Sequence, residues 1–195
     1  MEGPESESHG DVASPSMTHA LPVVLVLASG RGERFAASGG TVHKLQALLQ
    51  GQPVLQHTLE AVRASGLPWH LEDAGHPGMG DSIAAAVRAT PDAPGWLILP
   101  GDLPLISAAT LQAVAEALAR SEVVLPVCQG QRGHPVAFGA ACRDELLGLK
   151  GDRGAAQVAR SHDAIELIVD DVGCITDIDT LEDLRQAEAL LAQRL

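Results

Sequence analysis

The chain has 195 residues, close to the usual size of one domain, and 46% of them are apolar, which is enough material for a hydrophobic core. Only 2% are aromatic and none is tyrosine, so Val, Leu, Ile and Ala must build the core, as in layered strands and helices. The net charge of −12, with 13 Lys and Arg against 25 Asp and Glu, excludes a broad nucleic-acid surface, which needs clustered cations.

The cysteines and the apolar pattern indicate the cellular compartment of the protein. Cys128, Cys142 and Cys174 are far apart and odd in number, which favours neither a disulfide framework nor a zinc site. No run of about 18 apolar residues exists, and the first twenty residues are acidic, so we expect a cytoplasmic protein without membrane contact. Residues 1–20, rich in Ser, Gly, Pro and Glu, are predicted to be a disordered tail, and residues 21–195 a single domain.

Strands and helices alternate along the predicted domain. The apolar run at 21–27 predicts a buried strand that leads into a glycine turn, and 53–64 has helical spacing that ends at a Gly-Leu-Pro stop. Further helices are predicted at 82–89 (capped by Asp81 or Ser82), 111–119 and 181–195 (capped by Asp179 or Thr180), and strands at 96–99, 123–127, 136–138 and 165–169. This order predicts a three-layer, doubly wound α/β fold with a mostly parallel, Rossmann-like sheet.

The first strand leads into a loop suited to phosphate. Glycines at Gly30 and Gly32 let the backbone approach phosphate oxygens closely, and Arg34 and Lys44 can neutralise their charge. A single G-x-G is weak evidence, because glycines after strands often only make turns. The loop lacks both the third glycine of a dinucleotide fingerprint and the G-K-[ST] of a Walker loop, which argues against a dehydrogenase.

Acidic residues follow later strands. Asp102 stands in Gly-Asp-Leu-Pro after the strand at 96–99, and an acid beside a phosphate loop is a natural Mg²⁺ ligand. Asp177 and Asp179 alternate along an extended segment, so both carboxylates can point to the same face and hold the metal with Asp102. The alternatives are a turn or helix-cap role for Asp102 and a helix cap for Asp179. Asp170 and Asp171 are interpreted as a solvated turn.

Several ordered motifs resemble the MobA-like nucleotidyltransferases. They are Leu27-Ala28-Ser29-Gly30 with Arg34 and Lys44-Leu45, Gly51-Gln52-Pro53-Val54-Leu55, and Gly101-Asp102-Leu103-Pro104. Three further stretches and a closing one are similar to the molybdenum cofactor cytidylyltransferase branch: Gly78-Met79-Gly80-Asp81-Ser82, Arg132-Gly133-His134-Pro135-Val136, Gly151-Asp152-Arg153-Gly154-Ala155, and the segment from Asp177 to Leu184. The resemblance extends over most of residues 23–191.

The resemblance implies roles for these residues. Lys44, Arg34 and Asp102 are the expected catalytic residues, and the expected metal ligands for Mg²⁺ are Asp102 and Asp179, joined by Asp177. The expected nucleotide-binding set is Leu27, Ala28, Ser29, Gly30, Arg31, Gly32, Lys44, Gly80 and Ser82. The expected acceptor-binding set is Gly133, His134, Pro135, Asp152 and Arg153; for His134 the alternative is a turn residue with a solvated ring.

The implied reaction is transfer of CMP from CTP to a molybdopterin-type cofactor with release of pyrophosphate, so the expected partners are an NTP, CTP favoured, and a phosphorylated pterin. Transient contact with molybdoenzyme maturation proteins is also implied. The alternatives are a GTP- or other NTP-dependent transferase with a different phosphorylated acceptor, and a nucleotide-binding protein without catalysis.

The sequence departs from the family in two places. A Gly- and Ala-rich insertion at 35–43 precedes Lys44, is predicted to be mobile, and leaves the position of Lys44 open. Between Gly66 and Gly78 the family has a strand, a helix and another strand, but the segment here is too short for that unit. One edge strand and helix are therefore predicted to be missing.

Overall fold

The computed structural model describes residues 20–193, so nearly all of the predicted tail at 1–20 lies outside the described residues. Seven strands form the main sheet: β1 (Val23–Leu27), β4 (Trp69–Glu72), β5 (Gly95–Pro100), β6 (Val123–Cys128), β7 (Gln131–Arg132), β8 (Val136–Gly139) and β9 (Ala164–Ile168). The short strands β2 (Leu48–Leu49) and β3 (Gln52–Pro53) pair separately with each other.

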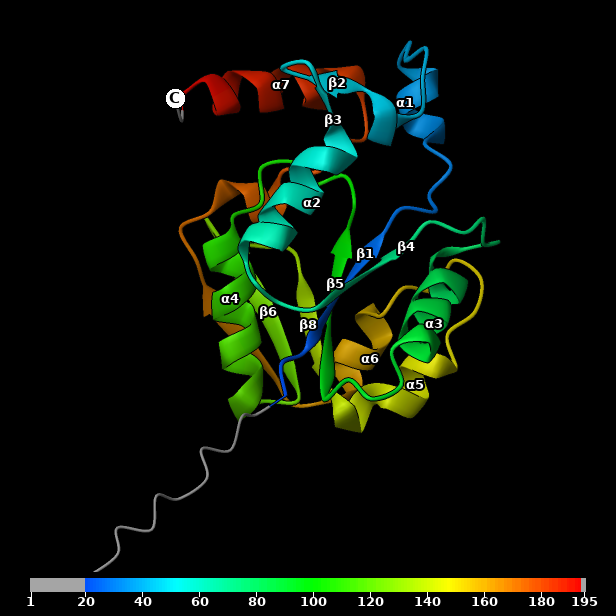
Figure 1. Cartoon of the computed structure of the whole chain (residues 1–195), viewed down its shortest axis with the longest axis vertical. Helices are drawn as coiled ribbons and strands as arrows, with labels where there is room; N and C mark the ends of the chain where they lie inside the picture. Colours follow the sequence, from blue (N-terminus) through cyan, green and yellow to red (C-terminus); the bar gives the residue numbers. More distant parts are fainter. Residues whose placement is uncertain (1–19, 194–195) are drawn as a thin grey trace, which may run out of the picture.

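Helices connect these strands (Figure 1). The α-helices are α1 (Glu33–Ala37), α2 (Val54–Ala64), α3 (Met79–Ala89), α4 (Ala108–Ala117), α5 (Arg143–Leu147), α6 (Ala156–Ser161) and α7 (Leu181–Ala192). Single 3₁₀ turns are η1 (Lys44–Gln46), η2 (Leu118–Arg120), η3 (Ala140–Cys142) and η4 (Val172–Ile175). The predicted elements are confirmed, with bounds that shift by a few residues at most ends.

The sheet is mostly parallel, as predicted. Its strand order is β4-β1-β5-β8-β6-β7, and β9 also pairs with β6. β1 pairs in parallel with both β4 and β5, and β9 pairs in parallel with β6, whereas β8 runs antiparallel to its neighbours β5 and β6. The carboxyl ends of β4, β1 and β5 therefore meet at one edge, where α/β proteins place their sites.

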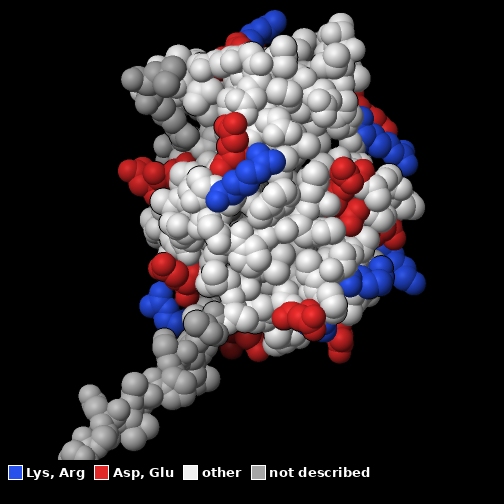
Figure 2. Space-filling model, viewed as in Figure 1, with Lys and Arg blue, Asp and Glu red and all other residues white. Residues whose placement is uncertain are grey.

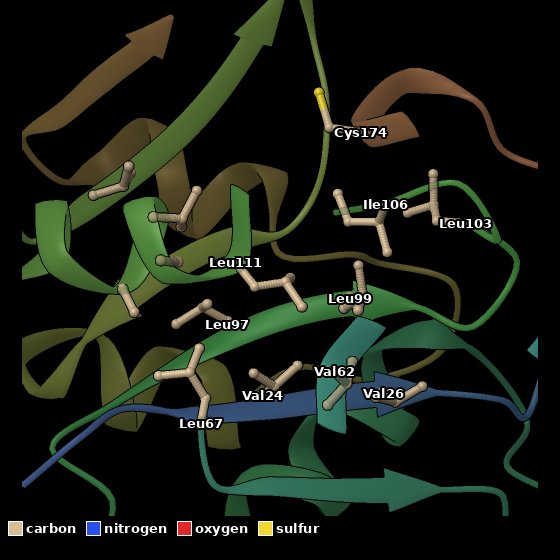
Figure 3. Close-up of a cluster of buried hydrophobic side chains, with 14 of the residues drawn as sticks. Val24, Val26, Val62, Leu67, Leu97, Leu99, Leu103, Ile106, Leu111 and Cys174 are labelled. Carbon is tan, nitrogen blue, oxygen red and sulfur yellow. The ribbon is translucent and has the colours of Figure 1, made fainter. Parts of the chain in front are cut away.

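Alternation along β1 and β5 divides the core into two layers. Val24 and Val26 of β1 face the layer with α2 and α4, while Leu25 faces the layer with α3, α5 and α6. β5 repeats the division, because Leu97 and Leu99 pack in the first layer and Trp96 and Ile98 in the second. Figure 3 shows the first layer, with Leu97, Leu99 and Val24 facing Leu111. These strands are buried on both faces, which explains their continuous apolar runs.

A third cluster lies beyond the carboxyl ends of the strands, under α1, η1 and α7 (Figure 1). Phe35 of α1, 1% exposed, packs there with Leu45, Ile178 and Ala187. Ser38 adds a hydrogen bond, because its Oγ accepts from the backbone N–H of Leu181 at 3.0 Å. The insertion at 35–43 therefore contacts the rest of the fold through Phe35 and Ser38, and its mobility stays a prediction.

The segment between Gly66 and Gly78 contains β4 and no helix. β4 lies at the edge of the sheet beside β1, so the region holds a single strand, in agreement with its predicted shortness. The next helix begins earlier than predicted: α3 starts at Met79 with Gly78 as its N-cap residue, and neither Asp81 nor Ser82 caps it.

Asp171 corrects another expectation, because it is 7% exposed and does not belong to a solvated turn. Its Oδ2 accepts hydrogen bonds from the Ser107 backbone N–H and the Thr110 hydroxyl, and its Oδ1 accepts one from the Gly173 N–H. Buried carboxylates need such partners to offset lost hydration. Asp171 therefore connects the start of α4 to η4.

The surface agrees with the composition. On the face in Figure 2, Lys and Arg side chains are scattered among acidic ones and form no continuous basic patch. Among the residues that the structure describes, no helix combines the length and hydropathy needed to span a lipid bilayer.

Candidate functional site

A cleft of about 510 Å³ opens at the carboxyl ends of β1 and β5 and at the start of α3. Its lining contains Leu27, Ser29, Gly30, Arg31, Gly32, Glu33, Arg34, Phe35, Lys44, Leu45, His76, Pro77, Gly78, Met79, Ser82, Pro100, Gly101, Asp102, Asp152 and Asp179. The predicted glycine loop, Lys44, Asp102 and Asp179 thus share one cavity. Ala28 and Gly80 are absent from this lining; both neighbours of Ala28 line the cleft, whereas only Met79 does so beside Gly80.

The glycine loop is held by a histidine that the sequence analysis did not single out. His43 Nε2 lies 2.6 Å from the Gly30 carbonyl oxygen, and His43 Nδ1 accepts from the Leu45 backbone N–H at 3.3 Å. Because Nδ1 accepts, Nε2 carries the proton and donates it to Gly30. Gly32, with φ 65°, provides the left-handed turn into α1. No local pattern marks His43, because its partner is thirteen residues away.

Lys44 lies between the two acids of the cleft. Its Nζ donates to Asp102 Oδ2 at 2.6 Å and to Asp179 Oδ1 at 2.9 Å, and its side chain is 14% exposed. Burial acts to lower the pKa of Lys44, but the charge of Asp102 and the hydrogen bonds to both acids raise it above the usual value. Lys44 is therefore a fixed positive charge at the end of β5, despite the insertion that precedes it.

Asp102 has one oxygen without a protein partner. Asp102 is 8% exposed, and its Oδ1 is buried without a hydrogen bond, while its backbone oxygen accepts from the Ile178 N–H at 3.0 Å. That backbone bond places the segment from Asp177 to Asp179 beside Asp102. A buried carboxylate oxygen without a donor is costly, and a cation is one partner that would satisfy it.

The pKa values of Asp177 and Asp179 shift in opposite directions. Partial burial, together with the charges of Asp102 and Asp179, raises the pKa of Asp177. Burial acts in the same direction on Asp179, but hydrogen bonding and charge from Lys44, with the charge of Arg34, hold the pKa of Asp179 below its usual value. Arg34 Nη1 lies 2.6 Å from Asp179 Oδ2, although its side chain is 77% exposed.

Two of the three predicted metal ligands, Asp102 and Asp179, line the cleft, whereas Asp177 is not part of its lining. Within residues 20–193, no group of three or more His, Cys, Asp or Glu side chains is arranged to hold a metal ion. Instead, the Lys44 ammonium occupies the position between Asp102 and Asp179. The acids fit a hard divalent cation by type and by the free Asp102 Oδ1, provided that the ammonium moves away from Asp102.

The start of α3 forms another wall of the cleft. Ser29 Oγ and Ser82 Oγ are 2.5 Å apart, so a hydroxyl hydrogen bond joins the glycine loop to α3. Gly78, Met79 and Ser82 line the cleft from the first turn of this helix. The predicted nucleotide residues Ser29 and Ser82, far apart in sequence, therefore meet in space.

The predicted acceptor residues separate into two groups. Asp152 lines the cleft, on the loop that packs against α3, whereas the exposed Arg153 does not line it.

Gly133, His134 and Pro135 also lie outside the wall of the cleft. The backbone N–H of His134 donates to the Cys174 oxygen at 2.8 Å, and a Cβ on Gly133 would meet that same oxygen at 2.4 Å. For His134, the alternative of a solvated ring is wrong, because Nδ1 of the ring is buried. This burial lowers the pKa of His134, while the nearby charge of Asp102 acts to raise it. His134 of this turn thus lies near Asp102, and its Nδ1 has no hydrogen-bond partner among the residues that the structure describes.

Comparisons with known proteins identify relatives of this chain. The model of the MobA-like NTP transferase domain matches residues 60–165. The molybdenum cofactor guanylyltransferase of Cupriavidus pinatubonensis is 28% identical, over 85% of this chain and 95% of that protein. The bifunctional protein GlmU of Stenotrophomonas maltophilia is 30% identical over 66% of this chain, which spans only 31% of that relative's length.

Solved structures show the same fold. The crystal structure of Rv0371c from Mycobacterium tuberculosis H37Rv has a TM-score of 0.74 and 24% identity, and the match covers 89% of this chain and all (100%) of that one. A manganese complex of Rv0371C has a TM-score of 0.69 and 23% identity, with 87% and 98% covered. At these identities, the likeness establishes the fold.

Proposed function

The chain belongs to the MobA-like NTP transferase family of nucleotidyltransferases, and on this premise we propose that it transfers CMP from CTP to a phosphorylated pterin and releases pyrophosphate. One observation carries the proposal. Lys44 Nζ, 2.6 Å from Asp102, lies at the meeting point of the glycine loop and the end of β5. A cation between acids and a glycine loop is suited to triphosphate and to a metal that accompanies it.

The proposed reaction is an in-line displacement. A terminal phosphate oxygen of the acceptor attacks the α-phosphorus of the NTP and forms the new P–O bond. The bond from the α-phosphorus to the α,β-bridging oxygen breaks, and its electron pair leaves with pyrophosphate. No covalent intermediate with the protein is required, so positioning and charge neutralisation are the main contributions of the protein.

The residues of the cleft supply that neutralisation. Ser29, Gly30, Arg31 and Arg34 line the cleft. The backbone N–H groups of this loop, together with Arg34, are the proposed triphosphate contacts. Lys44 must exchange one carboxylate for a phosphate oxygen, and Asp102 then gains a free oxygen. A divalent cation, with Mg²⁺ our proposed choice, would be held by Asp102 and Asp179 with Asp177 adjacent, and would supply charge stabilisation for the transferred phosphate.

The choice of CTP is supported by motifs. The Gly78 to Ser82 segment, the Gly-His-Pro turn and the Gly151 to Gly154 loop resemble the cytidylyltransferase branch. The second candidate is GTP, because the Cupriavidus pinatubonensis relative that aligns over 85% of this chain is a molybdenum cofactor guanylyltransferase. Both candidates share the phosphorylated pterin as acceptor.

Pyrophosphate release with each NTP, Mg²⁺ and molybdopterin tests the proposal. We expect CTP to give the highest kcat/KM, and a preference for GTP would select the second candidate. Thermal shift with each NTP separates binding from turnover, since a ligand at 100 times its Kd adds about 2.7 kcal/mol. Binding without pyrophosphate release would identify a non-catalytic nucleotide-binding protein.

Asp102→Asn is the matched control for that assay. The substitution retains the shape and removes the charge, so we expect pyrophosphate release to fall by at least about a hundredfold, the usual scale for loss of an electrostatic catalytic group. Circular dichroism must show an intact fold. Near-normal turnover in this variant would contradict the assignment of Asp102.

A further inference from the structure

Two hydrogen bonds join the start of α3 to the loop between α5 and α6, which runs alongside α3 in Figure 1. Asp81 Oδ2 accepts from the Gly151 backbone N–H at 2.8 Å, and the Gly80 N–H donates to the Gly151 oxygen at 2.8 Å. Both backbone polar groups of Gly151 are thereby bound to the first turn of α3. We name this pair of bonds the Gly151 clasp.

The backbones on either side of the clasp are in direct contact. A Cβ on Gly78 would lie 2.2 Å from the Gly151 carbonyl carbon, and a Cβ on Gly80 would lie 2.6 Å from the Arg153 oxygen. Gly151 itself has φ 60°, in the left-handed region that favours glycine. The glycines of the two motifs are therefore required for this contact, and Asp81 adds a charge-assisted hydrogen bond to it.

The clasp connects two walls of the same cleft. Gly78, Met79 and Ser82 line the side that the proposed function assigns to the nucleotide, and Asp152, adjacent to Gly151, lines the other. Asp81 does not line the cleft, so it can act only through the segments that it holds. The hydrogen bond between Asp81 and Gly151 restrains the loop as long as it is formed.

We infer that Asp81 is a positioning residue that couples the two substrate sites: it holds the loop at 151–154 against α3, so that nucleotide bound beside α3 fixes the acceptor loop. The coupling of the two substrates rests on the proposed function, whereas the clasp rests on the structure alone. A purely helix-stabilising role for this first-turn acid would affect stability and nothing specific to the loop.

Site-specific proteolysis tests the clasp without any substrate. The exposed Lys150 and Arg153 flank Gly151 and are trypsin sites. We expect Asp81→Ala to accelerate cleavage after both by about tenfold, the factor that corresponds to about 1.4 kcal/mol. Asp81→Asn retains an acceptor oxygen and must preserve resistance. Asp92→Ala removes an exposed acid beyond the other end of α3 and must cleave like the wild type.

Cleavage products are assigned by mass spectrometry, and rates are compared at a temperature where all variants are folded. Equal cleavage of the wild type and Asp81→Ala would overturn the clasp, as would loss of resistance in Asp81→Asn. If Asp81→Ala does not fold, hydrogen exchange of the Gly151 backbone amide is measured in the wild type and in Asp81→Asn. We expect this amide to be protected from exchange in both proteins. An unprotected amide in the wild type would overturn the clasp.

The coupling is tested with CTP, GTP, ATP and UTP, each with Mg²⁺. In the wild type, a nucleotide that binds must slow trypsin cleavage after Lys150 and Arg153. In Asp81→Ala, the nucleotide must no longer slow this cleavage, while its Kd changes less than about threefold. The acceptor KM must rise by about tenfold in Asp81→Ala and recover in Asp81→Asn. Bound nucleotide without protection in the wild type overturns the coupling. If the wild type binds none of the four, the proposed function fails while the substrate-free result for the clasp stands.

Discussion

Lys44 has a structural role in the cleft and a second role in the proposed function. Its ammonium neutralises Asp102 and Asp179 in the structure, and in the proposed function the same charge meets the triphosphate. Two acids at 2.6 and 2.9 Å hold the ammonium in place. The position of Lys44, which the insertion before it left open in the sequence, is therefore decided by its partners.

We predict that Lys44→Met weakens NTP binding by at least about tenfold and lowers the free energy of unfolding by about 1–3 kcal/mol. The second effect follows because the substitution leaves clustered carboxylates without their cation. Calorimetry with NTP and urea denaturation measure the two quantities. Lys150→Met, which removes an exposed lysine, is the control and must change neither. NTP affinity equal to the wild type would show that Lys44 is only structural.

A few buried polar side chains connect secondary-structure elements through hydrogen bonds. The Asp171 carboxylate receives donors from Ser107, Thr110 and Gly173 at 2.7 to 3.0 Å and so joins α4 to η4. We expect Asp171→Ala to lower the free energy of unfolding by about 2–4 kcal/mol, because it leaves buried donors unsatisfied. Urea denaturation measures the change. The exposed neighbour Asp170 provides the control: Asp170→Ala must cost less than about 0.5 kcal/mol, and similar losses in both variants would contradict the prediction.

His162 provides a pH-dependent connection between α5 and β6. Its Nδ1 lies 3.0 Å from Glu122 and its Nε2 lies 2.5 Å from Glu145. The hydrogen bond with Glu122, and then that with Glu145, raises the pKa of His162 above 6.5. A raised pKa in the folded state means that the stabilisation is complete below the unfolded pKa of about 6.5 and is lost as pH rises through the folded pKa.

We therefore predict that His162→Gln destabilises the protein more at pH 6 than at pH 9. The two acids are about half exposed to solvent, which screens their interaction with His162, so the difference is at most about 1 kcal/mol. Urea denaturation at both pH values measures it. The double variant Glu122→Gln/Glu145→Gln removes both acids, and His162→Gln in that background must cost the same at both pH values. An equal cost in the native background would contradict the prediction.

At the scale of the whole molecule, binding of a cation to the acidic residues of the cleft is expected to raise the thermal stability of the protein. The net charge of −12 attracts cations everywhere, but the free Oδ1 of Asp102 offers a specific site. We predict that Mg²⁺ or Mn²⁺ at 100 times its Kd raises the Tm by about 5 °C or more, since such a ligand adds about 2.7 kcal/mol. Asp102→Asn must lose most of this shift. An equal shift in the variant would indicate general screening of charge.

The sequence by itself determined the class of fold, the order of the elements and several of the residues that line the cleft. Continuous apolar runs predicted β1 and β5 because strands buried on both faces need them, and residues placed directly after such strands meet at one edge of a parallel sheet. Gly30, Asp102 and Lys44 could therefore be assigned to one site from local patterns, with the family resemblance adding Ser29, Asp152 and Ser82.

Only the tertiary structure decided which groups touch. The antiparallel direction of β8, the hydrogen bond from His43 to Gly30, the burial of Asp171 and the clasp between Asp81 and Gly151 all join segments brought together by packing. Local periodicity reports which face of an element is buried, but it carries no information about the partner that a polar group meets across the fold. For the same reason, the Lys44 ammonium between Asp102 and Asp179 could be seen only in the structure.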